Sequence, residues 1–240
     1  MENQNITLET LIEELHKTAT LKTRSFTAKL NPENNPDVIL GLKLGDIRKS
    51  AAVIKKNKLV IPFLEMKNLH YLEDIMLYGI VLSDVKDIEI VDKYIFNFLA
   101  NNISWSTNDA VNLTIFKRSQ NYDYLLNLFE RAHKKGIDNP YLFRFIVSSM
   151  MQNFNDEELY DSNFDFIKAN LNNTYYENMM VAWYIQKVAT RNIEYAKKMI
   201  VEINNPTIIK MAVQKIRDSF VFTKEVKDDF SKLKLQILNK

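Results

Sequence analysis

The sequence predicts an all-α fold built from stacked pairs of helices, and three observations support this prediction. Glycine supplies only 4 of the 240 residues and proline only 5, whereas glycine alone usually makes up about 7% of a chain. A sheet-based fold would need more glycine in its turns. Apolar residues recur in successive segments with the i, i+3, i+4, i+7 spacing of an amphipathic helix. Hydrophobic residues make up 46% and charged residues 26% of the chain, which is the usual balance for a protein with a buried core.

The N-terminal part of the chain predicts two helices and a loop. The first helix begins near Thr7, and its apolar stripe consists of Leu8, Leu11, Ile12 and Leu15. A short second helix is predicted over residues 23–30. The clearest loop follows at residues 31–36, where two prolines and three asparagines occur together. Gly41 and Gly45 then bracket a bend before the next helix.

The rest of the chain predicts helices that come in pairs joined by short polar connections. After a helix at 47–56, the expected pairs are 59–67 with 71–82, 88–101 with 108–118, 122–135 with 140–154, 157–170 with 175–190, and 193–203 with 207–220, followed by a last helix at 224–238. These pairs recur about every 35–40 residues, the spacing of HEAT or armadillo-like arrays. Stacked pairs bury their apolar faces against each other and create a concave surface. We therefore expect one α-α superhelix, a solenoid of HEAT-like repeats, as a single domain over residues 1–240.

Composition and charge exclude several classes of protein. The chain has no cysteine, which removes disulfides, cysteine zinc sites and a thiol nucleophile. Residues 1–5 contain no basic or apolar signal segment, and no apolar run reaches the roughly 18 residues that span a bilayer. We therefore expect a cytoplasmic protein without a membrane partner. Residues 181–240 hold 12 Lys and Arg against 6 Asp and Glu, which suits either a polyanion-binding end or solvated lysine-rich helix faces.

Several familiar catalytic motifs are missing from the sequence. No phosphate-binding loop, dinucleotide fingerprint, nucleophile elbow or H-E-x-x-H zinc motif occurs. The three histidines, His16, His70 and His133, are far apart, so we expect no metal site and no cofactor.

Four residues remain as candidates for chemistry, namely Trp105, Asp109, Arg144 and Trp183. Each one alone also suits core packing, helix capping or an ion pair. Together, however, they belong to three successive second helices of the predicted pairs or to the start of one, and in a solenoid the second helices line one concave wall. If a helix begins at Ser106 or Thr107, Trp105 lies at its start and Asp109 about one turn further on.

These residues lie within stretches that resemble a known family. The stretches are LGLKLGDIR at 40–48, YLEDIMLYG at 71–79, Trp105-x-x-x-Asp109, YLFRFIV at 141–147, YYENMMVAW at 175–183 and IKMAVQKIRDS at 209–219. In this order they resemble the AlkD-type DNA alkylation-repair proteins, which are DNA glycosylases built of HEAT-like repeats. The similarity runs from about residue 25 to residue 222.

The resemblance implies that the protein hydrolyses the N-glycosidic bond of cationic alkylpurines of the 3-methyladenine or 7-methylguanine type. Its partner would be double-stranded DNA containing alkylated bases, and it would act as a monomer without metal or cofactor. Trp105 and Trp183 match the two aromatic residues that flank the lesion, Asp109 matches the catalytic carboxylate, and Arg144 matches the arginine that holds the DNA backbone. A carboxylate suits this chemistry because it stabilises the oxocarbenium character that develops on the sugar.

The rim of the concave surface should supply cations for DNA phosphates. The candidates are Arg48, Lys187, Arg191, Lys210, Lys215 and Arg217; the alternative for each is an ordinary exposed charge. Two other functions remain open. Residues 7–30 match the family poorly, and some relatives keep the fold without excision, so a catalytically inactive protein that binds damaged, bent or branched DNA is one alternative. A HEAT-type scaffold for protein interactions is the other.

Overall fold

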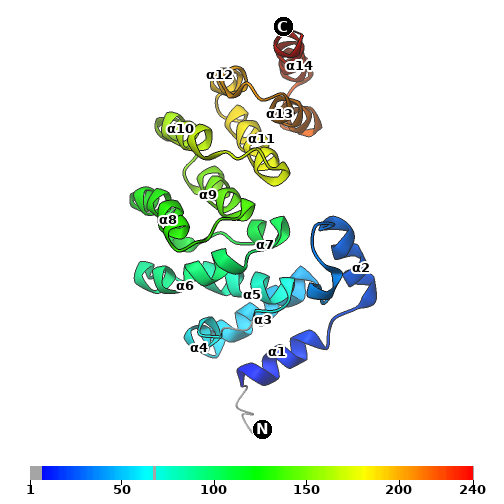
Figure 1. The fold of residues 1–240 in the computed structure, drawn as a ribbon, viewed down its shortest axis with the longest axis vertical. Coiled ribbons are helices and arrows are strands. Elements are labelled where there is room, and N and C mark those ends of the chain that lie inside the picture. Colours follow the sequence, from blue (N-terminus) through cyan, green and yellow to red (C-terminus); the bar gives the residue numbers. More distant parts are fainter. Residues whose placement is uncertain (1–6, 67–68, 240) are drawn as a thin grey trace. The chain divides into compact units, whose positions relative to one another are not determined.

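A computed structural model of the chain describes residues 7–66 and 69–239, and all regular structure within these ranges is helical (Figure 1). Fourteen α-helices and four short 3-10 helices occur there, without a strand among the described residues. The all-α prediction is therefore confirmed. The signal-free segment at residues 1–5 and the predicted end of a helix at Lys67 lie outside the described residues.

The chain divides into two compact units, residues 1–142 (unit 1) and residues 143–240 (unit 2). Helix α9 (Pro140–Asn153) contains the boundary. The single domain expected from the sequence stays a prediction.

Unit 1 consists of α-helices and short 3-10 turns in its described part. The α-helices are α1 (Leu8–His16), α2 (Leu21–Leu30), α3 (Leu44–Lys56), α4 (Val60–Leu64), α5 (Leu72–Ser83), α6 (Ile88–Asn101), α7 (Trp105–Asp109) and α8 (Tyr122–Lys134). The 3-10 helices are η1 (Pro36–Val38), η2 (Thr114–Lys117) and η3 (Ser119–Asn121).

Helix α5 is the core of unit 1. Nine of its twelve residues are buried, and it contacts α3, α4, α6 and α7. The hydroxyl of Tyr78 lies within hydrogen-bond distance of two carbonyl oxygens, at 3.1 Å from Leu64 O and 3.2 Å from Tyr94 O. A Cβ atom on Gly79 would lie 2.3 Å from Cγ2 of Val111. Only glycine therefore lets the chain that follows α7 approach α5 so closely.

The carboxylate of Glu73 ties α5 to the segment before α3. Glu73 is 2% exposed, and it accepts hydrogen bonds from the backbone N–H groups of Leu40, Gly41 and Leu42 at 3.0, 2.7 and 3.1 Å. Gly41 has a φ of +95°, and a Cβ there would lie 2.5 Å from the carbonyl oxygen of Thr20, just before α2. The bend expected at Gly41 is therefore real, and it supports the start of α2. Gly45 lies in the first turn of α3 instead.

The predicted helix at 108–118 is wrong. Helix α7 ends at Asp109, and the chain runs on to the 3-10 helix η2 at Thr114. Val111 and Leu113 are buried on either side of the half-buried Asn112, and this alternation before η2 suits an extended chain better than a helix. The backbone N–H of Asn112 lies 3.2 Å from Oγ of Ser83, its acceptor at the end of α5. Tertiary contacts with α5 thus replace helical hydrogen bonds here.

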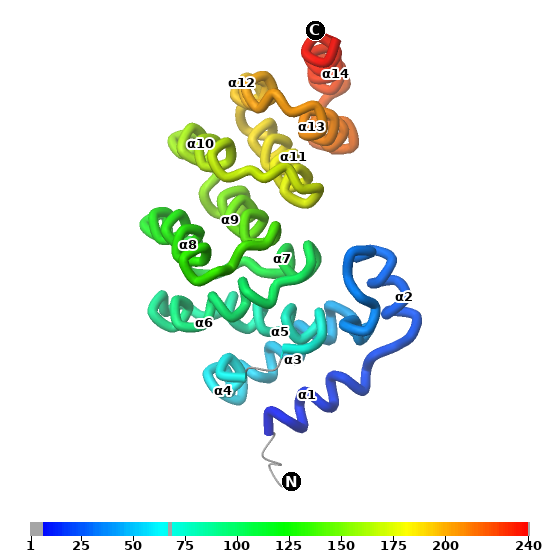
Figure 2. The backbone as a smooth tube through the Cα atoms, in the orientation of Figure 1, coloured from blue at the N-terminus to red at the C-terminus, as the bar shows by residue number. Residues whose placement is uncertain are grey.

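Unit 2 contains most of α9, the 3-10 helix η4 (Glu157–Leu159) and five further α-helices. These are α10 (Tyr160–Asn170), α11 (Tyr175–Ala189), α12 (Ile193–Ile203), α13 (Pro206–Asp218) and α14 (Lys224–Leu238). Helix α11 packs on α12 and α13, and α13 packs on α14 (Figure 2). A capping box formed by Thr174 and Glu177 begins α11, and Pro206 begins α13, where a first-turn proline is tolerated.

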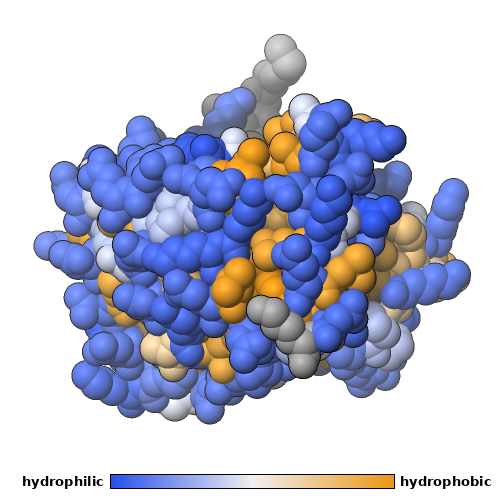
Figure 3. Space-filling view, turned by 90° about the horizontal axis from the view of Figure 1, so that it is seen from above, coloured by the Kyte–Doolittle hydropathy of each residue, from blue (hydrophilic) through white to orange (hydrophobic). Residues whose placement is uncertain are grey.

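The surface is largely hydrophilic on the face that Figure 3 shows, with hydrophobic side chains exposed between the polar ones. Exposed large apolar side chains include Leu21 and Phe26 on α2 and Phe220 and Val221 after α13. Within the described ranges, none of the helices has both the length and the apolar character needed to cross a bilayer.

The three hydrogen bonds of Glu73 predict a large effect on stability. We expect Glu73→Ala to lower the free energy of unfolding by about 3–5 kcal/mol, because it leaves three backbone N–H groups without their acceptor. Urea unfolding followed by circular dichroism measures this change. The control is Glu89→Ala, which removes an exposed carboxylate from the first turn of α6 and should cost less than about 1 kcal/mol. Equal losses in the two variants would contradict the role given to Glu73.

Candidate functional site

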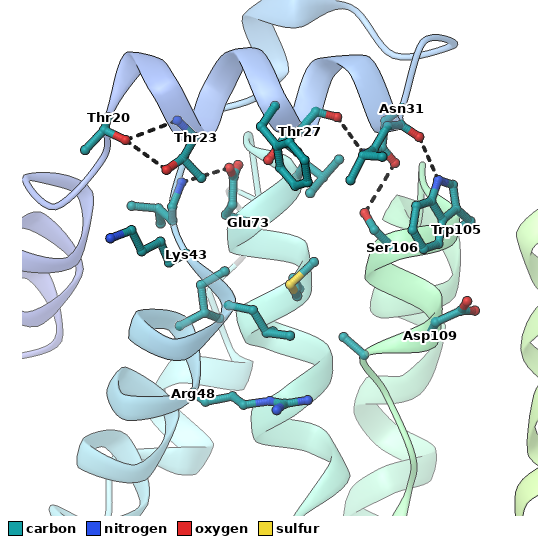
Figure 4. Close-up of a pocket in the computed structure, with 18 of the residues that line it drawn as sticks. Thr20, Thr23, Thr27, Asn31, Lys43, Arg48, Glu73, Trp105, Ser106 and Asp109 are labelled. Carbon is teal, nitrogen blue, oxygen red and sulfur yellow. Dashed lines mark hydrogen bonds between the residues drawn. The ribbon is translucent and has the colours of Figure 1, made fainter.

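A cavity of about 880 Å³ lies in unit 1 beneath α2, between that helix and parts of α3, α5 and α7 (Figure 4). Its walls are largely apolar, with Phe26 from α2, Ile47 from α3 and Met76 from α5 among the lining side chains. Cavities of roughly 300–1,000 Å³ with apolar walls and a few polar groups are typical of binding sites for small molecules.

The polar groups of this cavity include three residues predicted from the sequence. Trp105 and Asp109 line it from α7, and Arg48 lines it from α3. In Figure 4, Asp109 lies one turn along α7 from Trp105, and the guanidinium of Arg48 lies across the lower part of the cavity. Lys22 and Lys43 add two further cationic side chains to the lining. The sequence did not mark Lys43 as a site residue.

Helix α7 sets the spacing between the indole and the carboxylate. Ser104 begins this helix, because its hydroxyl oxygen accepts a hydrogen bond from the backbone N–H of Ser106 at 3.0 Å. Trp105 is then the first helical residue and Asp109 the last. Side chains four residues apart share one face of a helix. The predicted arrangement of Trp105 and Asp109 at one turn from each other is therefore present, although the helix begins at Trp105, before the expected starts.

Buried amides support the position of the Asp109 carboxylate. The side-chain N–H₂ of Asn108 lies 3.4 Å from Oδ1 of Asp109, and the side-chain N–H₂ of Asn102 donates to Oδ1 of Asn108 at 3.1 Å. Thr107 donates to Oδ1 of Asn102 in turn. Asn102, Thr107 and Asn108 are at most 2% exposed. The sequence does not indicate this network, because asparagine and threonine near a helix end usually mark a turn.

Helix α2 forms the roof of the cavity, and hydrogen bonds hold it at both ends and, through Arg24 and the carbonyl oxygen of Pro36, along its length. None of its residues is buried. At its start, the backbone N–H of Thr20 donates to the carbonyl oxygen of Gly41 at 3.1 Å. At its end, the indole N–H of Trp105 donates to the carbonyl oxygen of Leu30 at 2.9 Å.

Asn31, directly after α2, adds a second connection at the same end. Its side-chain oxygen accepts hydrogen bonds from the hydroxyl of Ser106 at 3.3 Å and from the hydroxyl of Ser104. The sequence places Asn31 in a loop and gives no indication of these contacts with α7. This end of the roof is thus held by Asn31 and by Trp105, and Trp105 also lines the cavity.

Arg144 lies in unit 2, in α9, and is 2% exposed. Its Nη1 donates to the carbonyl oxygen of Tyr176, in the first turn of α11, at 3.1 Å. The guanidinium is thus buried beside α11 in this conformation. Its predicted role in holding the DNA backbone stays a prediction.

Trp183 lies on α11, where it is 38% exposed. Nζ of Lys215 on α13 lies 4.8 Å from the centre of the Trp183 ring. This is within the roughly 6 Å range of a cation–π interaction. The structure therefore brings together two predicted site residues in unit 2, Trp183 and Lys215. They contact each other, whereas separate roles toward the lesion and toward DNA phosphates were expected.

The remaining predicted cations of unit 2 differ in their contacts. Lys187 on α11 and Lys210 and Arg217 on α13 are exposed. Arg191 is engaged by Asp156 at 2.8 Å and by the carbonyl oxygen of Asn155. Arg191 thus connects the end of α11 to the segment before η4.

The four candidates for chemistry divide between the units, with Trp105 and Asp109 in unit 1 and Arg144 and Trp183 in unit 2. No cluster of three or more residues suited to hold a metal ion occurs in the part of the chain that the structure describes.

Comparisons of the chain with models of protein families, with curated proteins and with solved structures gave no match. The similarity to AlkD-type proteins therefore rests on the sequence stretches themselves.

The hydrogen bond of Trp105 predicts that α2 depends on this side chain. We expect Trp105→Phe to speed hydrogen exchange of the α2 amides by roughly 2- to 10-fold, because one net hydrogen bond contributes about 0.5–1.5 kcal/mol. Hydrogen exchange followed by mass spectrometry measures this change. Trp183→Phe is the matched control and should leave the exchange rates of the α2 amides unchanged. Unchanged exchange in Trp105→Phe would show that the roof is held by other contacts.

Proposed function

We propose that the protein is a DNA glycosylase of the AlkD type, which hydrolyses the N-glycosidic bond of cationic alkylpurines in duplex DNA. One observation carries the proposal: Trp105 and Asp109, one helical turn apart, line the same largely apolar cavity in unit 1. An aromatic face and a carboxylate are the two groups that a cationic base and its developing sugar cation need.

The chemistry follows from these two groups. A 3- or 7-alkylated purine carries a positive charge, so it is already a good leaving group. Breaking its bond to the sugar develops oxocarbenium character, which a fixed carboxylate such as that of Asp109 stabilises. The buried amides of Asn102 and Asn108 favour a fixed position for this carboxylate. The carboxylate also suits the orientation of the attacking water.

The surroundings of Trp183 support a role in recognising a cation. Its ring already has the ammonium of Lys215 at 4.8 Å from its centre, so the ring face is able to accept a positive charge. Cation–π interactions contribute about 0.5–2 kcal/mol, depending on how far the pair is removed from water. A cationic alkylpurine is a suitable ligand for such a face.

We further propose that the helical pairs form a superhelix whose concave side binds DNA. Packing of α11 on α12 and α13, and of α13 on α14, is the nearest-neighbour stacking expected of such repeats. The exposed Lys187, Lys210 and Arg217 of unit 2 would neutralise phosphates, and Arg48 would do so in unit 1. Arg144, being buried, would act through its hydrogen bond to α11 unless its side chain moves.

Two observations favour the second candidate, a family member that binds DNA without excision. Helix α2 roofs the cavity that Asp109 lines, and in Figure 4 the Asp109 carboxylate points away from Glu73 and Arg48 on the opposite side. Arg144 is also buried. The two functions share the DNA-binding surface and differ in whether a base is released.

Release of a free base from methylated duplex DNA tests the proposal. We expect the unmodified protein to release 3-methyladenine or 7-methylguanine in single-turnover reactions. Asp109→Asn should reduce the rate by about 100-fold or more, because it removes the charge that stabilises the transition state. Duplex binding, and its decrease with added salt, should persist in this variant.

Asp123→Asn is the matched control, since it removes an exposed carboxylate from α8 and should leave the rate unchanged. Duplex binding without any released base would overturn the glycosylase function and leave the DNA-binding alternative. Absence of salt-dependent duplex binding would overturn both.

A further inference from the structure

The contact between Lys215 and Trp183 covers a ring that is otherwise well placed to bind a ligand. Trp183 is 38% exposed, and Nζ of Lys215 lies 4.8 Å from the centre of its ring. The two side chains come from neighbouring helices, α11 and α13, which pack against each other in unit 2. Lys215 is half-buried, and its aliphatic chain is able to follow the indole while the ammonium stays near water.

An indole face attracts a cation through the negative charge density of its π system. An ammonium over that face and a flat organic cation stacked on it compete for the same surface. A ligand of this kind therefore has to displace Lys215, and the free energy of the internal contact is subtracted from its affinity. Lysine suits this role because its ammonium is a compact charge on a flexible chain, and because phosphate oxygens bind it strongly.

We propose that the exposed face of Trp183 is a site for a flat organic cation and that Lys215 covers this face until a phosphate draws its ammonium away. The proposal rests on the proposed function, in which that cation is the alkylated base and the phosphate belongs to the same DNA. Lys215 is then a specificity-determining residue: it admits a cationic ring that arrives together with a phosphate and disfavours the same ring alone.

The surrounding charges favour such an exchange. Lys187 is exposed one turn beyond Trp183 on α11 and therefore on the same face of that helix. Lys187 and Lys215 thus place two ammonium groups near the Trp183 ring, and such neighbouring cations attract phosphate. Phosphate draws the Lys215 ammonium away and so frees the Trp183 ring for the cation. The cation displaces the same ammonium and so frees it for phosphate. The two ligands therefore favour each other's binding, and such coupling is reciprocal.

The chain offers a direct measurement, because Trp105 and Trp183 are its two tryptophans. In a Trp105→Phe background, all indole fluorescence comes from Trp183. The probe is the N-methylnicotinamide cation, a flat cationic ring that quenches indole fluorescence on contact. Acrylamide, a neutral quencher, reports access without charge. If the phenylalanine background does not fold, Trp105→Tyr replaces it.

Lys215→Met and Lys187→Met form the matched pair of variants. Both remove one positive charge near Trp183, but only Lys215 lies over the ring. We expect Lys215→Met to raise the quenching constant for the cation by about 2- to 30-fold, which corresponds to a contact of about 0.5–2 kcal/mol. Lys187→Met should raise it clearly less. Inorganic phosphate should increase quenching by the cation relative to chloride at equal ionic strength, and this increase should vanish in Lys215→Met.

Two results would overturn the inference. Equal effects of the two variants would show that overall charge, and not cover of the ring, controls access. A phosphate effect that survives in Lys215→Met would show that Lys215 does not couple the two ligands. Because these measurements involve neither DNA nor base release, they can fail while the glycosylase assay succeeds, and the reverse also holds.

Discussion

The architecture of the cavity depends on one buried carboxylate. Glu73 sits on the central helix α5 and accepts the backbone N–H groups of three successive residues, Leu40, Gly41 and Leu42. A carboxylate that receives several N–H groups away from water is strongly bound to them, because no solvent competes. The segment of residues 40–42 that is fixed in this way supports the start of α2 through Gly41. Leu42 of this segment and residues of α5 also form a wall of the cavity beneath α2. This anchor therefore supports one wall of the cavity and the start of its roof, whereas Trp105 and Asn31 hold the other end of α2.

Each of the two tryptophans already has a partner within its own unit. The indole N–H of Trp105 is bound to the end of α2, while the ring face of Trp183 has the ammonium of Lys215 above it. Such a partly exposed aromatic side chain is accessible to a ligand, while its internal contact holds it in place. In the proposed function, a ligand on the ring face of Trp183 therefore competes with an internal contact, whereas the hydrogen bond of Trp105 occupies the N–H edge of its ring. Binding of this kind selects ligands that offer more than one favourable interaction.

The position of the candidate residues could be predicted from the sequence only in part. The pairing of Trp105 with Asp109 followed from the spacing of one helical turn, which is a local property. The burial of Arg144 did not, since an arginine in a helix is usually exposed and only its neighbours decide otherwise. The error at 108–118 has the same origin: alternating apolar residues such as Val111 and Leu113 pack on α5 and leave the helical path.

By itself, the sequence determined the helical class of the protein, most of its helices and the turn that separates Trp105 from Asp109. These features follow from periodicity, from capping residues and from the scarcity of glycine, all of which act between residues close in the chain. Only the tertiary structure decided that α2 roofs a cavity, that Glu73 holds Gly41, and that Lys215 covers Trp183. These contacts join residues that are roughly 30 to 75 positions apart, and no local pattern encodes which distant partners meet, because packing and the satisfaction of buried polar groups select them together.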